Sequence, residues 1–98
     1  MSASPIDQTS EARRVVTICN QRGLHARAAA RFVKTAAQFD AEVSVRKNGT
    51  EVSGRSIMGL MMLAAAPGTV VELVGTGRQA EAAVTALADL IECKFDEE

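Results

Sequence analysis

The stretch AEVSVRKNGTEVS, residues 41–53, decides the fold. Residues 41–47 alternate between apolar and polar side chains, which predicts a half-buried strand. Asn48-Gly49 follows and favours a two-residue hairpin turn, because both residues tolerate positive φ. Residues 50–53 then predict a short return strand. Since a hairpin makes its two strands antiparallel neighbours, the sequence predicts an antiparallel sheet.

The segments on both sides of this hairpin predict further strands and helices. Residue type and spacing indicate strands at 13–20 and 69–75, and helices at 25–39, 56–65 and 78–92. The helices at 25–39 and 78–92 each have an apolar face, made by Ala29, Phe32, Val33, Ala36 and Ala37 and by Ala80, Ala83, Val84, Leu87 and Ile91. One sheet with three helices on one face buries these apolar positions. The expected fold is an α/β (α+β) open-faced βαββαβα sandwich with a four-stranded antiparallel sheet.

The length and composition set limits on organisation. The chain has 98 residues, which is enough for one domain and too few for two. We expect a flexible leader at residues 1–12, the folded domain at 13–95 and an acidic tail at 96–98. The whole end from Phe95 to Glu98 is expected to fray.

The composition also excludes several classes of function. The net charge is −1, so no overall field attracts nucleic acid or a membrane surface. There are three Phe and no Tyr or Trp, which argues against modules that stack bases on aromatic rings. No apolar run reaches the roughly 18 residues of a membrane span, and no signal peptide is recognisable. Cys19 and Cys93 lack metal-ligand spacing and are interpreted as free thiols of a cytoplasmic protein.

His25 is the one histidine of the chain and the leading candidate for chemistry. It follows a loop that contains Gly23 and opens the first predicted helix. Helix N-termini present unpaired N–H groups and a partial positive charge, which favour a bound phosphate and disfavour the imidazolium. Arg27 lies in the first turn and can bind phosphate oxygens, while Arg31, one turn later, extends the positive surface. A metal site is not expected, because no second histidine, cysteine or acid lies at ligand spacing from His25.

Ser56 and the apolar helix after it form a second candidate region. Ser56 stands at the expected N-cap of the helix at 56–65, and Pro67-Gly68 ends that element. The helix is apolar on all sides. If Leu60, Leu63 and Ala64 face the core, then Ile57, Met58 and Met61 are left near the surface. Exposed apolar patches tend to be docking sites, and Met adapts to different partners.

Two motifs together resemble a known family. Residues 23–29 (GLHARAA) and residues 56–63 (SIMGLMML) look like the phosphocarrier protein HPr family of the bacterial phosphotransferase system. The resemblance extends from about Val15 to Ile91, and the fold of that family is the sandwich expected above. The family usually has Pro where this chain has Ala28. Alanine is a good helix former, so the helix should persist, with a less rigid entry.

The resemblance implies a role for each matching residue. His25 matches the histidine that accepts a phosphoryl group on Nδ1 from phosphorylated enzyme I and donates it to an EIIA domain. The original donor is phosphoenolpyruvate. Arg27 matches the arginine that balances the phosphate charge, and Ser56 matches the serine that HPr kinase/phosphorylase modifies. Ile57, Met58 and Met61 match the apolar docking patch. Arg31 is also expected to take part in partner docking.

The expected protein is therefore a monomeric phosphoryl carrier without cofactor, metal or independent enzymatic turnover. Sugar uptake and nitrogen- or metabolism-linked regulation use similar carriers, so both branches stay open. The segment Ser56-Ile57-Met58-Gly59 favours a kinase-regulated carrier. The alternative function is a regulatory interaction protein that acts through the apolar patch beside Ser56 without carrying phosphate. The occurrence of His25 and Arg27 together favours the carrier.

Overall fold

The computed structural model describes residues 11–97 of the chain. Its strands are β1 (Glu11–Thr17), β2 (Glu42–Lys47), β3 (Thr50–Ser53) and β4 (Val70–Thr76). Its helices are α1 (Ala26–Ala36), α2 (Ile57–Met62) and α3 (Ala80–Glu92), followed by the short 3₁₀ segment η2 (Lys94–Asp96). The element order is βαββαβα, as the sequence predicts.

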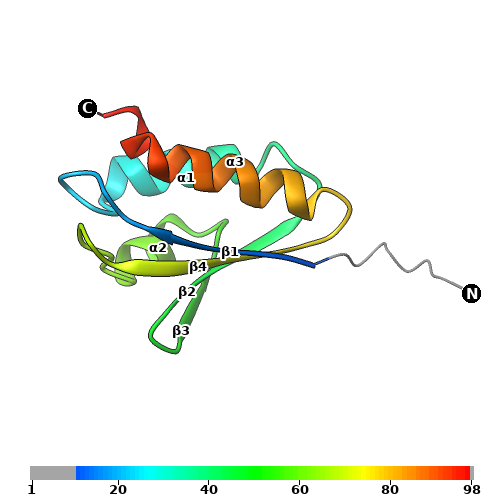
Figure 1. Ribbon diagram of the computed structural model, residues 1–98, viewed down its shortest axis with the longest axis horizontal. Coiled ribbons are helices and arrows are strands. Elements are labelled where there is room, and N and C mark those ends of the chain that lie inside the picture. The colour runs from blue at the N-terminus through cyan, green and yellow to red at the C-terminus, as the bar shows by residue number, and fades with distance from the viewer. Residues whose placement is uncertain (1–10, 98) are drawn as a thin grey trace, which may run out of the picture.

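The four strands form one antiparallel sheet in the order β1-β4-β2-β3. The helices pack on one face of the sheet, with α1 and α3 side by side (Figure 1). Figure 1 also shows the C-terminal end, in red, beside the cyan start of α1. The predicted open-faced sandwich is confirmed.

The β2–β3 hairpin turns where the sequence predicts it. Asn48 has φ of 49° and Gly49 has φ of 84°, so both turn residues adopt the left-handed region. Lys47 pairs with Thr50 across the turn, and Val45 pairs with Val52 in the same register. The turn chemistry therefore sets the pairing of β2 with β3.

The core lies between the sheet and the helices. The predicted inner face of α3 is buried at every position, and Ala88 joins it. In α1, Ala29, Phe32 and Ala36 are buried, but Ala37 is exposed because the helix ends at Ala36. Ala64 is also exposed, because α2 ends at Met62 and Ala64 adopts the left-handed conformation. The inward position was thus predicted wrongly for these two alanines.

Two boundaries of the expected domain organisation differ from the structure. β1 begins at Glu11, so Glu11 and the buried Ala12 belong to the sheet rather than to a leader. The rest of the expected leader, residues 1–10, lies outside the described residues, as does Glu98. At the other end, Phe95 is completely buried and Glu97 contacts His25, so the prediction of a fraying end is wrong for residues 95–97.

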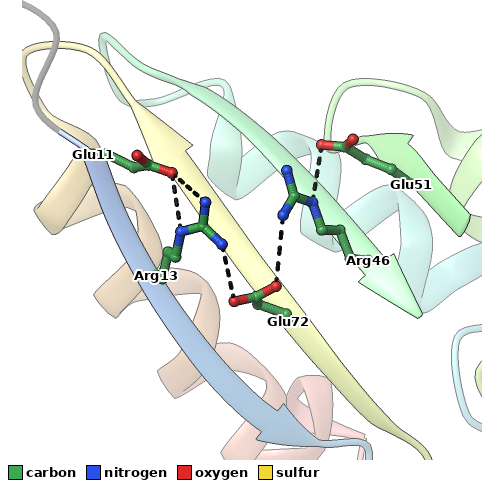
Figure 2. Close-up of polar contacts among 5 residues, drawn as sticks. All are labelled: Glu11, Arg13, Arg46, Glu51 and Glu72. Carbon is green, nitrogen blue, oxygen red and sulfur yellow. Dashed lines mark hydrogen bonds and ion pairs between the residues drawn. The ribbon is translucent and has the colours of Figure 1, made fainter. Parts of the chain in front are cut away.

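The face of the sheet opposite the helices carries a row of ion pairs (Figure 2). Arg13 contacts Glu11 at 2.9 Å and Glu72 at 3.5 Å, and Arg46 contacts Glu72 at 3.8 Å and Glu51 at 3.4 Å. Opposite charges thus alternate across all four strands. Such half-exposed pairs add little stability one by one, but they keep this face polar.

Candidate functional site

The loop before α1 fixes the position of His25. Gly23 has φ of 65°, and a Cβ on it would lie 2.4 Å from the carbonyl oxygen of Ala65. Only glycine permits this approach. Next to it, the Leu24 N–H donates to the same oxygen at 2.9 Å. His25 then forms the N-cap of α1 in an extended backbone conformation, and its side chain does not cap the helix.

His25 lies in a shallow hollow of about 400 Å³. The side chains that line it come from the loop before α1, from α1 itself and from the C-terminal end: Gln21, Arg22, His25, Arg27, Arg31, Asp96 and Glu97. Three of these residues are arginines. Together with the N-terminus of α1, they make the hollow suitable for an anion such as phosphate.

The imidazole ring is held on one edge by the C-terminal segment. Its Nε2 lies 2.5 Å from Oε2 of Glu97, and the side chains of His25 and Glu97 are 23% and 14% exposed. The ring is therefore mostly enclosed, and the contact engages Nε2 rather than Nδ1.

Asn20 holds the Glu97 carboxylate in place by a hydrogen bond. Its side chain is fully buried, and its Nδ2 donates to the Gly23 carbonyl at 2.8 Å and to Oε1 of Glu97 at 3.1 Å. Burial by itself would raise the pKa of the Glu97 carboxyl. Hydrogen bonds from Asn20 and His25, with the charges of His25 and Arg22, outweigh burial and lower that pKa below its ordinary value. Glu97 is therefore a carboxylate at neutral pH.

Arg31 holds the backbone of the C-terminal segment. Its Nη1 donates to the Phe95 carbonyl at 2.7 Å and lies 3.8 Å from the Asp96 carboxylate. Its side chain remains 42% exposed, so it also contributes charge to the hollow.

Ser56 forms a conventional helix cap. Its Oγ accepts a hydrogen bond from the Gly59 N–H at 2.9 Å, as expected for an N-cap serine. A Cβ at Gly59 would lie 3.1 Å from that oxygen, so the glycine keeps the cap uncrowded. At the other end of α2, Lys47 Nζ donates to the Leu63 carbonyl at 2.9 Å.

The surface of α2 is apolar, as the sequence predicts. The exposed fractions are 41% for Ile57, 68% for Met58 and 41% for Met61, while Leu60 is fully buried. Met62, which sequence reasoning did not select, is 77% exposed and enlarges the patch.

The structure brings some of the predicted site residues together and leaves others apart. His25, Arg27 and Arg31 share one hollow, whereas Ser56 and the apolar patch lie on α2 and do not line it. Sequence reasoning missed Arg22, Asn20 and Glu97. Arg22 stands in the loop beside Gly23, which was a signal that could have been used. No local pattern marks Glu97.

Other kinds of site find no support within residues 11–97. Cys19 and Cys93 are free, exposed thiols, as predicted. No cluster of three or more potential metal ligands occurs among these residues. None of the helices described is both long and apolar enough to cross a membrane.

Comparisons with known proteins identify the family of the chain. Residues 12–93 match the family model described as "PTS HPr component phosphorylation site". Phosphocarrier protein HPr of Neisseria meningitidis serogroup A is 55% identical over 82 residues, which cover 84% of this chain and 92% of the relative. Phosphocarrier protein NPr of Shewanella violacea is 44% identical over 84 residues, covering 86% of this chain and 92% of the relative.

A solved structure shows the same fold. The crystal structure of HPr-C-His from Thermoanaerobacter tengcongensis superposes with a TM-score of 0.85 at 46% identity, covering 89% of this chain and 98% of that one. The fold, the family model and these relatives thus define a small phosphoryl-carrier class of protein. Within that class, the chain belongs to the HPr family of the phosphotransferase system, whose members carry a phosphoryl group rather than turn over a substrate.

Proposed function

We propose that His25 is the phosphoryl-accepting residue of this carrier. In this proposal its Nδ1 takes the group from phosphorylated enzyme I, which phosphoenolpyruvate supplies, and passes it to a histidine of an EIIA domain. Arg27 balances the charge of the bound phosphoryl group. We expect the carrier to act as a monomer in the cytoplasm, without metal or cofactor.

The position of the His25 ring supports this proposal most directly. The ring stands at the N-terminus of α1 in a hollow that three arginines line. A neutral imidazole is a competent nucleophile, and the positive surroundings stabilise the phosphoryl group that it receives.

The test is phosphorylation with enzyme I and phosphoenolpyruvate. We expect acid-labile phosphate on the wild-type protein, none on His25→Ala, and about tenfold slower labelling of Arg27→Ala. Lys34→Ala is a matched control, because Lys34 is an exposed cation on the same helix outside the hollow. Equal labelling of His25→Ala would refute the assignment, and equal slowing of the Lys34 variant would remove the specific role of Arg27.

We further propose that phosphorylation of Ser56 regulates docking on α2. The resemblance of residues 56–63 to the family motif and the exposed patch of Ile57, Met58 and Met61 support this proposal. A phosphate on Ser56 would add about two negative charges beside that patch. Partners that surround it with acidic residues would then bind less well. HPr kinase/phosphorylase is the expected modifying enzyme.

Incubation with ATP and this kinase, followed by mass spectrometry, tests the modification. We expect one phosphate on the wild-type protein and none on Ser56→Ala. Ser53→Ala, which changes a neighbouring exposed serine, should be modified like the wild type. Phosphate that persists on the Ser56 variant would contradict the assignment.

A further inference from the structure

The Glu97 carboxylate determines which nitrogen of His25 carries the proton. A carboxylate accepts hydrogen bonds and cannot donate them, so the 2.5 Å contact places a proton on Nε2. In the neutral ring, Nδ1 then holds the free electron pair. Because Oε1 of Glu97 already accepts from Asn20 at 3.1 Å, the orientation of the carboxylate is fixed.

The backbone that delivers Glu97 is strained and strongly anchored. Lys94, Phe95 and Asp96 have φ values of 56°, 55° and 60°, a left-handed turn without glycine. Non-glycine residues in this conformation are strained and persist only where the surroundings hold them. Here the buried Phe95 ring and the hydrogen bond from Arg31 to its carbonyl hold the turn. Backbone strain of this kind tends to occur at functional sites.

The charge of Glu97 matters during the transfer itself. When Nδ1 attacks phosphorus, a new N–P bond forms, and the donor's bond to phosphorus breaks with its electron pair leaving on the donor. Nε2 keeps its proton, so the ring becomes a phosphorylated cation. The Glu97 carboxylate faces the Nε2 edge of this cation, while Arg22, Arg27 and Arg31 line the hollow that receives the phosphoryl oxygens.

We propose that Glu97 is a positioning residue for phosphoryl transfer. It holds the Nε2–H form of His25 and stabilises the positive charge that the ring acquires as Nδ1 takes the phosphoryl group. The same assignment explains why the Glu97 side chain is held in a hollow that three arginines line. The inference rests on the proposed function of His25.

The hydrogen bond is tested first, in the unphosphorylated protein and without any donor. In ¹H–¹⁵N spectra we expect a resolved, slowly exchanging Nε2–H signal of His25 in the wild type and in Glu92→Gln. Glu92→Gln is a matched control, since Glu92 is an exposed acid at the end of α3 outside the hollow. The signal should be lost in Glu97→Ala. A signal that survives in Glu97→Ala, or that is missing from the wild type, overturns the proposal.

The effect of charge is tested with phosphoramidate, a small phosphoryl donor that needs no protein partner. Glu97→Gln keeps the size of the side chain and removes its charge. We expect uptake about tenfold slower than in the wild type, because an opposite charge within about 4–6 Å favours a charged form by at least tenfold. Thermal unfolding should show that Glu97→Gln is folded at the assay temperature. A folded variant with the wild-type rate would overturn the charge role.

These two measurements separate this inference from the proposed function. If wild-type His25 takes up no phosphoryl group from either phosphoramidate or enzyme I, the proposed function fails, whatever the spectrum shows. If uptake occurs on His25 but Glu97→Gln and Glu97→Ala behave like the wild type, only the role of Glu97 fails.

Discussion

The starts of α1 and α2 are two helix N-termini with different uses of the capping residue. His25 and Ser56 both hold the N-cap position in extended backbone. Only the Ser56 side chain caps its helix, by accepting a hydrogen bond from the Gly59 N–H. The His25 ring instead faces arginines and a carboxylate, whereas Ser56 borders exposed apolar side chains. The comparison shows that the N-cap side chain is available for a chemical role when other contacts, such as that of Leu24 with Ala65, fix the start of the helix.

The largest expected effect comes from breaking the support of α1 at Gly23. Gly23→Ala places a Cβ 2.4 Å from the Ala65 carbonyl oxygen and forces an alanine into φ of 65°. We expect a loss of about 3 kcal/mol in unfolding free energy, measured with denaturant, together with loss of phosphoryl uptake.

Gly49→Ala provides the control for this substitution. Gly49 also has positive φ, at 84°, but a Cβ there meets nothing within 4 Å. The expected loss is only about 1 kcal/mol, since strain acts without a clash. Equal losses in the two variants would mean that the contact with Ala65 does not decide the position of His25.

Removing the cap of α2 should have a smaller effect. Ser56→Ala deletes the acceptor of the Gly59 N–H and is expected to cost about 1 kcal/mol in unfolding free energy. Ser56→Asp retains an acceptor and should stay close to the wild type, as equilibrium denaturation can show. If the aspartate variant loses as much as the alanine variant, Ser56 contributes something other than a cap.

At the opposite end of α2, a substitution should add stability. Ala64 has φ of 54° just after the helix and is exposed, so glycine fits this backbone better. Ala64→Gly is expected to raise the unfolding free energy by about 0.5–1 kcal/mol, and its Tm should rise accordingly. A fall in Tm would show that the contacts of the alanine methyl group outweigh the strain.

The smallest expected effect is the pH dependence of stability that the Glu97 carboxyl causes beside the His25 ring. Folding lowers the pKa of the Glu97 carboxyl, in a site that it shares with His25, Arg22, Arg27, Arg31 and Asp96. Its contribution to stability is therefore complete above the unfolded-state pKa of about 4.3 and is lost as pH falls through the lower folded-state pKa.

Denaturation curves of the wild type and Glu97→Gln measure this contribution. The wild type should be the more stable protein near neutral pH, and the difference should shrink as the pH falls below about 4.3. A difference that is constant across that range would contradict an ionised Glu97.

The strands and helices could be predicted because their signals are local. Asn48-Gly49 fixes the hairpin, and the spacing from Ala80 to Ile91 fixes the inner face of α3. The exposed patch of α2 followed from its apolar composition. Errors such as Ala37 and Ala64 lie one or two residues beyond helix ends, where periodicity no longer governs direction.

The part of the site that escaped prediction depends on contacts between distant residues. Glu97 meets a histidine 72 positions earlier, through a turn of three non-glycine residues with positive φ. Local preference argues against such a turn, and its acidic composition suggested a solvated end. Asn20 stands at the end of the strand predicted at 13–20, where no local signal marks it. Its hydrogen bonds to Gly23 and Glu97 nevertheless make it a structural link.

The left-handed turn of η2 also affects how the domain opens. Releasing Phe95–Glu97 exposes one phenylalanine and breaks the hydrogen bonds from Arg31, Asn20 and His25. It also relieves three strained residues and leaves the sheet intact, so this opening should cost less than unfolding the sheet. Amide protons of η2 should therefore exchange with solvent well before those of β4. Because Glu97 is attached through this turn, opening of η2 would also uncover the Nε2 edge of the His25 ring.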